Sequence, residues 1–242
     1  MAYDVVIIGA GPAGLSAACK IKQINPSYSV CVLEKGSEVG AHILSGAVFE
    51  PTALNELFPN WQDMSAPLNT PVTDDHILLL QQQKQIRVPG IFAPKTMHNH
   101  GNYIISLGSF CRWLAAQAEN LGVEIFPGFS AAEILYGEND EVLGIATGDM
   151  GLSKTGEKKD SYMQGMELHA KYTLFAEGCR GHLGKQLIDK YQLDKDKDPQ
   201  HYGLGIKELW KVPADQHQPG LVVHSAGWPL SETGTLGGGF LN

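Results

Sequence analysis

The order of apolar and polar positions predicts a strand, a turn and a helix at the start of the chain. An apolar, β-branched run from Val5 to Ile8 enters the glycine-rich turn of "DVVIIGAGPAGLSAACKI". Apolar residues then recur at helical spacing through Leu15, Ala18 and Ile21. A second apolar run of strand length, "SVCVLEKG", follows. Strands that alternate with a helix in this way predict an α/β unit with a parallel sheet.

The turn itself has the spacing of a dinucleotide-binding motif, Gly9-x-Gly11-x-x-Gly14. The first glycine permits the tight turn, the second lets the backbone approach a pyrophosphate, and the third allows close helix packing. Glu34 ends the second strand about 20 residues further on, where a carboxylate accepts the ribose hydroxyls. A glycine-rich turn without a ligand is the alternative, and the strand, the helix and the acid in register argue against it.

The motif leaves the choice of dinucleotide open. Its place at the extreme N-terminus, without a second copy, is typical of proteins that hold FAD as a resident cofactor. A strand from Tyr172 to Ala176 also breaks at Glu177-Gly178 before a helical run from His182. Gly178 either ends this strand or lets the backbone approach the same ligand.

The middle of the chain mixes two patterns. Helices are expected in "PTALNELF", with Pro51 at the first turn, and from Ser109 to Leu121, and the strand "VEIF" follows the second helix. Hairpins are expected in "HILLLQQQKQIRVPG" and in "AEILYGENDEVLGIAT", and long strands in "YGLGIKELWKV" and "GLVVHSAGW". These patterns predict a sheet-rich second domain interwoven with the first, and the charged stretch "DKDKDPQ" is a surface connection between them.

Charge and cysteine content narrow the function. The chain has 18 basic and 26 acidic residues, a net charge of -8, which opposes binding to nucleic acid. Cys19, Cys31, Cys111 and Cys179 have no metal-binding spacing, so we expect no metal site and interpret them as small packed residues in a reduced compartment. No targeting segment is expected before the first strand, and no apolar run reaches the roughly 20 residues of a membrane span.

Several longer strings make the chain resemble the N-terminal portion of the bacterial-type electron-transfer-flavoprotein:ubiquinone oxidoreductases. They include "GAHILSGAVFEP", "NHGNYIISLG", "GVEIFPGFSAAEILY", "MELHAKYTLFAEGCRGHLGKQL" and "YGLGIKELW". The resemblance runs over essentially all 242 residues. It implies an FAD-dependent oxidoreductase that accepts electrons from reduced electron-transfer flavoprotein and reduces ubiquinone. It also implies a 4Fe-4S cluster and a monotopic position on the cytoplasmic face of the bacterial inner membrane. Another flavoprotein of the same fold, such as a geranylgeranyl reductase or an aromatic hydroxylase, is the alternative.

The implied fold class is α/β: an FAD-binding Rossmann-like domain of the glutathione-reductase/hydroxylase type with an interwoven β-rich quinone-binding domain, truncated at the C-terminus. Residues 1–75 and 102–195 would form the FAD-binding domain. Residues 76–101 would form the quinone and membrane-contact segment, and residues 196–242 an incomplete quinone-binding domain.

The motif and the resemblance together predict the site residues. The FAD site is expected at Gly9, Gly11, Pro12, Ala13, Gly14, Glu34, Lys35 and Gly178. Gly237 and Gly238 match paired glycines whose backbone approaches the quinone, with a β-bulge as the alternative. Ile91 and Phe92 match an apolar membrane-contact tip, and a plain exposed hairpin is the alternative. No catalytic side chain is named, because the flavin ring carries the electrons, and His42, Ser45 and His100 are left out as ordinary polar loop residues.

The ending "TLGGGFLN" departs from the family pattern after the glycines. The resemblance implies that the rest of the quinone domain, a second FAD-binding stretch and the cluster cysteines would follow. We therefore expect the chain to be an incomplete and inactive piece of the enzyme.

Overall fold

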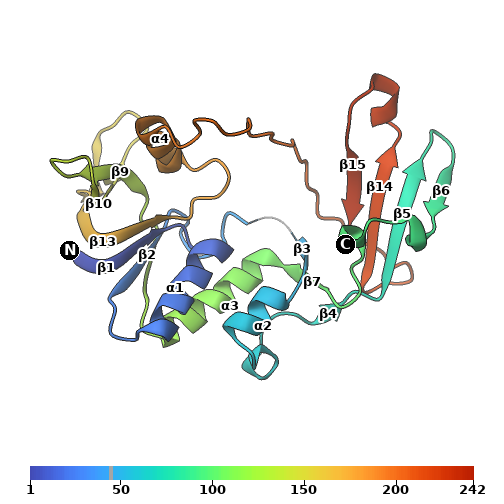
Figure 1. Ribbon diagram of the computed structural model, residues 1–242, viewed down its shortest axis with the longest axis horizontal. Coiled ribbons are helices and arrows are strands. Elements are labelled where there is room, and N and C mark those ends of the chain that lie inside the picture. Colours follow the sequence, from blue (N-terminus) through green and yellow to red (C-terminus); the bar gives the residue numbers. More distant parts are fainter. Residues whose placement is uncertain (44–45) are drawn as a thin grey trace. The chain divides into compact units, whose positions relative to one another are not determined.

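The computed structural model describes residues 1–43 and 46–242, which form two compact units. The first unit contains residues 1–43 and 111–205, and the second contains residues 46–110 and 206–242 (Figure 1). Each unit is built from segments that are distant in the sequence. The predicted domains, residues 1–75, 76–101, 102–195 and 196–242, are a functional division of the chain that these units do not test, so they remain a prediction.

A six-stranded sheet in the order β8-β2-β1-β13-β10-β9 forms the centre of the first unit. Its central strands are almost completely buried, since Val6, Ile7 and Val32 have no exposed surface. Strands buried on both faces are apolar without alternation, which explains the runs in the sequence. The parallel strands are β1 (Ala2–Ile8), β2 (Val30–Glu34), β8 (Glu124–Pro127) and β13 (Glu167–Phe175), and β9 (Ala131–Tyr136) and β10 (Val142–Thr147) form an antiparallel hairpin beside them.

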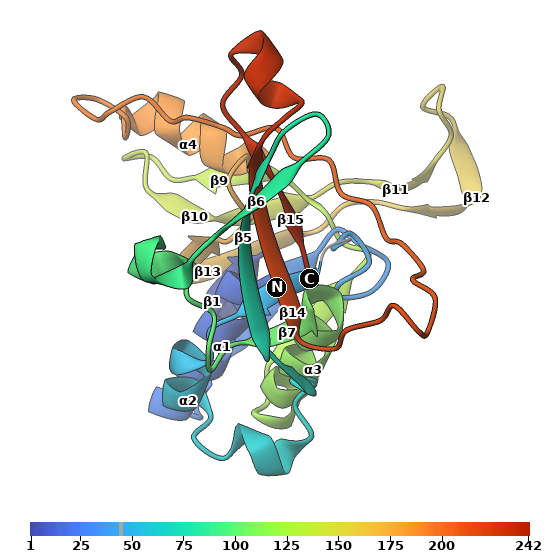
Figure 2. The same cartoon turned by 90° about the vertical axis from the view of Figure 1, so that its right-hand side faces the viewer.

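Helices cover both faces of this sheet. α1 (Pro12–Ile24) packs through the buried Leu15 and Ala18 on the face that carries Ile7. Leu183 of α4 (His182–Tyr191) joins Val6 on the opposite face. α3 (Leu107–Asn120) lies beside α1 (Figure 1), and β11 (Met150–Leu152) with β12 (Lys158–Met163) forms a separate hairpin that extends away from the sheet (Figure 2).

The second unit contains two smaller sheets. The larger has the order β15-β14-β5-β6, in which β5 and β14 are parallel and the other pairs antiparallel. Its strands are β5 (Asp74–Leu80), β6 (Gln85–Val88), β14 (Leu221–Gly227) and β15 (Gly238–Leu241). The smaller sheet joins β3 (Gly46–Phe49), β7 (Tyr103–Ser106) and β4 (Thr70–Pro71), and the helices are α2 (Thr52–Leu57) and the 3-10 turns Trp61–Met64, Gly90–Phe92, Lys95–Met97 and Leu230–Thr233.

One predicted element is wrong. The segment "YGLGIKELWKV", expected as a strand, has no regular structure, and Leu204 and Trp210 are 97% and 77% exposed. A strand needs a neighbour to satisfy its backbone hydrogen bonds, and this segment pairs with none of the described strands. The expected helices and both expected hairpins are confirmed, the second turning at Gly137 to Asp140.

A buried lysine fixes the end of α1 against the loop that follows. Lys22 is almost completely buried, and its Nζ donates to the carbonyl oxygens of Pro26 at 2.7 Å and Tyr28 at 2.9 Å. The ammonium group thus satisfies two carbonyl groups between α1 and β2. Charged groups are buried in proteins when they are paired in this way.

We expect Lys22→Met to lower the free energy of unfolding by about 1 to 3 kcal/mol, because two carbonyl groups lose their donor. Lys20→Met on the exposed side of α1 is the matched control and should change it by less than about 0.5 kcal/mol. Chemical denaturation followed by circular dichroism measures both. Equal stability of the two variants would contradict the bridging role of Lys22.

Candidate functional site

The carboxyl ends of three parallel strands bring the predicted FAD residues of the first unit to one edge of its sheet. Ile8 of β1 is in register with Leu33 of β2 and with Phe175 of β13. The turn Gly9–Gly14, the pair Glu34 and Lys35, and Gly178 follow these three positions. In open α/β sheets this edge is where ligands bind.

Backbone packing explains two of the three glycines in the turn. Gly9 has a φ of 104°, and a Cβ atom on it would lie 2.5 Å from the carbonyl oxygen of Ala176. A Cβ atom on Gly14 would lie 2.0 Å from the carbonyl oxygen of Gly9. Both positions therefore exclude any larger residue, because the turn is packed between α1 and the end of β13.

Gly11 differs, because no described atom beyond Gly11 itself and its two chain neighbours lies within 4 Å of a Cβ atom built on it. The protein alone gives no steric reason for glycine here. The open space lies at the N-terminus of α1, where a pyrophosphate would need the backbone to be bare. The residues present therefore fit a dinucleotide at this position.

The N-terminus of α1 is also electrostatically open. Gly11 is its N-cap residue without a capping side chain, Pro12 fills the first position, and Ala13 and Gly14 follow in the first turn. At α4, by contrast, the carboxylate of Glu177 accepts the N–H groups of Gly184 at 2.7 Å and Leu183 at 3.3 Å. Of these two helix ends, only that of α1 keeps its amide groups and positive dipole for an anionic ligand.

Glu34 sits between the two loops at the strand ends. Its carboxylate accepts the N–H of Ala10 at 3.0 Å and that of Gly36 at 2.7 Å, one through each oxygen. A carboxylate has about four acceptor positions, so about two remain for hydroxyl groups of a ribose. Lys35 beside it is exposed. Gly178 is exposed with a φ of 84° and has free space around it.

The buried thiols are inert. Burial raises the pKa of Cys19 and of Cys31 to about 12 and that of Cys111 to about 11. They stay protonated at neutral pH, and thiols in this state are poor nucleophiles and metal ligands. Cys179 is exposed. Within residues 1–43 and 46–242, no three His, Cys, Asp or Glu side chains gather as a metal site.

In the second unit, the predicted quinone glycines lie at the start of β15. A Cβ atom on Gly238 would lie 2.1 Å from the carbonyl oxygen of Ser225, and one on Gly237 would lie 2.8 Å from a methyl group of Leu230. β14 and β15 pair in a regular register from Gly238 to Leu241, so the alternative of a β-bulge is wrong for Gly238. Strand packing is a sufficient reason for glycine at Gly238, whatever it binds.

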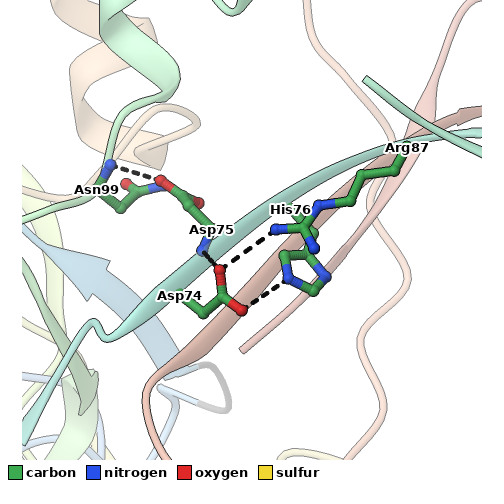
Figure 3. Close-up of polar contacts among 5 residues, drawn as sticks. All are labelled: Asp74, Asp75, His76, Arg87 and Asn99. Carbon is green, nitrogen blue, oxygen red and sulfur yellow. Dashed lines mark hydrogen bonds and ion pairs between the residues drawn. The ribbon is translucent and has the colours of Figure 1, made fainter. Parts of the chain in front are cut away.

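The predicted membrane tip follows β6. Ile91 and Phe92 are 87% and 76% exposed in the 3-10 turn Gly90–Phe92. The far end of this loop is fixed on β5, where Asp75 accepts the backbone N–H of Asn99 at 2.7 Å and its amide Nδ2 at 3.0 Å (Figure 3). The tip is therefore an apolar protrusion held at both ends.

Sequence reasoning missed the polar groups around β5. Asp74 contacts His76 at 2.8 Å and Arg87 at 3.4 Å (Figure 3), and the hydrogen bond from His76 lowers the pKa of Asp74. Asp75 and the buried Asn99 form a second group with His224. The carboxylates of Asp74 and Asp75, which precede the apolar residues of β5, were the sequence signal that could have pointed to these polar groups. Of the residues left out earlier, His42 and His100 are exposed and Ser45 lies outside the described residues.

No helix in the described part of the chain combines the length and the apolar character that crossing a bilayer requires.

Two family profiles match the chain. Residues 7–62 match an NAD(P)-binding Rossmann-like domain, and residues 202–242 match a domain described as "ETF-QO, ubiquinone-binding". The first covers the open turn and Glu34. The second covers His224 and the glycines of β15.

Curated relatives match the chain from end to end. It is 65% identical to the electron transfer flavoprotein-ubiquinone oxidoreductase of Pseudomonas aeruginosa, over 100% of this chain and 45% of that protein. It is 52% identical to the mitochondrial protein of that name from Bos taurus, over 98% of this chain and 39% of that protein. The chain thus spans less than half the length of these relatives.

Similar solved structures show the fold of the chain, but their sequence identity is too low to show its family. A geranylgeranyl bacteriochlorophyll reductase-like protein of Thermoplasma acidophilum has a TM-score of 0.56 at 17% identity, over 94% of this chain and 51% of that one. The flavin-dependent brominase Bmp2 has a TM-score of 0.51 at 18% identity, over 79% and 41%. The fold is thus of the α/β FAD-binding Rossmann-like class, and by its sequence the chain belongs to the electron transfer flavoprotein-ubiquinone oxidoreductase family.

Proposed function

We propose that the protein containing this chain is an FAD-dependent oxidoreductase that accepts electrons from reduced electron-transfer flavoprotein and passes them to ubiquinone. The observation that carries the proposal is the 65% identity over the whole chain to a relative of that name. Neither a geranylgeranyl reductase nor a hydroxylase has comparable support, since the reductase-like structure is 17% identical and shares the fold alone.

The first unit would hold the FAD. The bare backbone at Gly11 and the uncapped N-terminus of α1 suit the pyrophosphate, and the remaining acceptor positions of Glu34 suit the adenosine ribose. Pro12, Ala13, Lys35 and Gly178 would line the same edge. When bound, the flavin supplies the redox chemistry, so the protein side chains have to position it and exclude water.

The second unit would meet the quinone and the membrane. Gly237 and Gly238 lie within the segment that matches a ubiquinone-binding domain, which supports their assignment to the quinone. Ile91 and Phe92 would enter the interface of the bacterial inner membrane from its cytoplasmic face as a monotopic contact. The 4Fe-4S cluster implied by the family needs several cysteine thiolates close together, and no such group forms within residues 1–43 and 46–242.

Gly11→Val tests the FAD site. We expect at least about tenfold weaker FAD binding, because two methyl groups would occupy the space of the pyrophosphate. Gly90→Val is the matched control, since a Cβ atom on Gly90 also has free space around it. FAD is titrated into each variant of the gene product that contains this chain, and bound flavin is measured by fluorescence quenching. Equal affinity in the Gly11 variant and the parent would refute the assignment.

Phe92→Asp tests the membrane contact. We expect weaker co-sedimentation with liposomes of bacterial lipid, because a carboxylate at the tip would have to be desolvated. Ile24→Asp, at a residue of the first unit that is 71% exposed, is the control and should leave co-sedimentation unchanged. An equal loss of co-sedimentation in both variants would contradict a specific membrane contact at Ile91 and Phe92.

The 242 residues expressed alone test how much of the activity they contain. Because they span 45% of the Pseudomonas relative, we expect substoichiometric FAD, no bound iron and no quinone reduction with electron-transfer flavoprotein as the donor. Size-exclusion chromatography, flavin and iron analysis and the assay are made on the same peak. Near-stoichiometric FAD with donor-dependent turnover would contradict this expectation.

A further inference from the structure

One face of the four-stranded sheet in the second unit carries an unusual distribution of side chains. The register places Ile86, Leu79, Ala226 and Gly238 in one row across the four strands, and Val88, Ile77, His224 and Phe240 in the next. In these two rows His224 is the polar side chain among apolar ones. We call these eight residues the His224 face.

The His224 face is accessible at its apolar end. Leu79, Ile86 and Phe240 are each about half exposed, and Ala226 and Gly238 are also exposed. The charged cluster of Asp74, His76 and Arg87 occupies alternate positions of the same strands and so lies on the opposite face (Figure 3). The His224 face therefore offers apolar contact area around one half-buried imidazole.

Hydrogen bonds that link Asp75, Asn99 and Nε2 of His224 hold the imidazole in place. The amide Nδ2 of the buried Asn99 lies 3.0 Å and 3.2 Å from the two carboxylate oxygens of Asp75, 3.2 Å from the carbonyl oxygen of Met97 and 3.3 Å from Nε2 of His224. The contact with Asp75 determines which way the amide points, since the amide oxygen would be repelled by the carboxylate. Asn102 donates to the amide oxygen on the other side at 3.3 Å.

These hydrogen bonds select one form of the histidine. The two amide hydrogens are shared among Asp75, Met97 and His224, and an amide nitrogen does not accept hydrogen bonds, so Nε2 of His224 is the acceptor in its contact with Nδ2. The proton of the neutral ring is then on Nδ1. Among the described residues Nδ1 has no hydrogen-bond partner, and the ring lies beside that of Phe240 with the centroids 5.0 Å apart.

We propose that the Nδ1–H group of His224 donates a hydrogen bond to a carbonyl oxygen of the quinone, and that Asn99 and Asp75 are positioning residues that hold the ring in this tautomer. A neutral donor suits a neutral carbonyl group. The row that contains Leu79, Ile86 and Gly238 provides the apolar contact that a quinone ring needs. The proposal rests on the proposed quinone function and deepens it, because the family comparison assigns a segment and no side chain.

Nuclear magnetic resonance of the gene product that contains this chain, labelled with 15N-histidine, tests the tautomer directly. Long-range proton–nitrogen correlations, with His224 assigned through its backbone resonances, distinguish Nδ1–H from Nε2–H. We expect Nδ1–H in the parent and a shift toward Nε2–H in Asn99→Leu, which removes the donor. A parent ring in the Nε2–H form would overturn the proposal, and this measurement on the parent needs no variant that could fail to fold.

Titration of the same gene product with decylubiquinone in mild detergent, followed by intrinsic fluorescence, tests the contact itself. We expect His224→Gln to raise the Kd about 3- to 10-fold, the range for loss of one hydrogen bond. His76→Gln, on the opposite face of the neighbouring strand, should leave the Kd unchanged. If the parent binds and the two variants bind equally well, the role of His224 is refuted while the quinone function stands. If the parent does not bind, the quinone assignment of this unit is refuted together with it.

Discussion

The close approach of backbone to backbone at the carboxyl end of β1 is the constraint on which the first unit depends. The N–H of Gly9 donates to the carbonyl oxygen of Leu33, and that of Ala176 donates to the carbonyl oxygen of Ile8, both at 2.8 Å. These bonds extend the parallel pairing of β1 with β2 and β13 into the loops. They leave no room for a side chain at Gly9. The turn, the acid and Gly178 thus meet because three strands end together.

The ends of two helices near this edge differ in whether a side chain satisfies their amide groups. Glu177 supplies a negative group to the first turn of α4, which satisfies its amide groups from within the protein. No equivalent side chain follows β1, where the sequence has Gly11 and Pro12 instead. A ligand phosphate would therefore compete with the Glu177 carboxylate for the amide groups of α4, but only with water for those of α1. A single acidic residue thus distinguishes the two helix ends.

The sequence predicts the strand, turn, helix and strand at the start of the first unit because the signals for these elements are local. The apolar runs, the glycine spacing and the position of Glu34 all lie within the first 34 residues, and each has one physical explanation. The strand expected at residues 202–212 failed for the opposite reason. Alternation shows that a segment could pair, but pairing also requires a partner strand, and Leu204 and Trp210 stay exposed without one.

The group around His224 lay beyond sequence reasoning for a related reason. Asn99 and His224 are separated by 125 positions, and Asp75 lies on a third segment. Their contact follows from the parallel pairing of β5 with β14, and no local sequence pattern predicts this pairing. Nothing distinguishes Asp75 from the exposed Asp74 in the sequence, although alternation puts the two carboxylates on opposite faces of the sheet.

Asp75 links two features of the second unit that would otherwise be independent. Its carboxylate accepts the backbone N–H of Asn99, which ends the loop that carries Ile91 and Phe92, and it also accepts the side-chain amide that contacts His224. The same residue thus anchors the apolar tip and orients the imidazole. Since an amide nitrogen held by a carboxylate cannot turn its oxygen toward His224 without breaking that bond, the loop has to keep its anchored position for the ring to keep its tautomer.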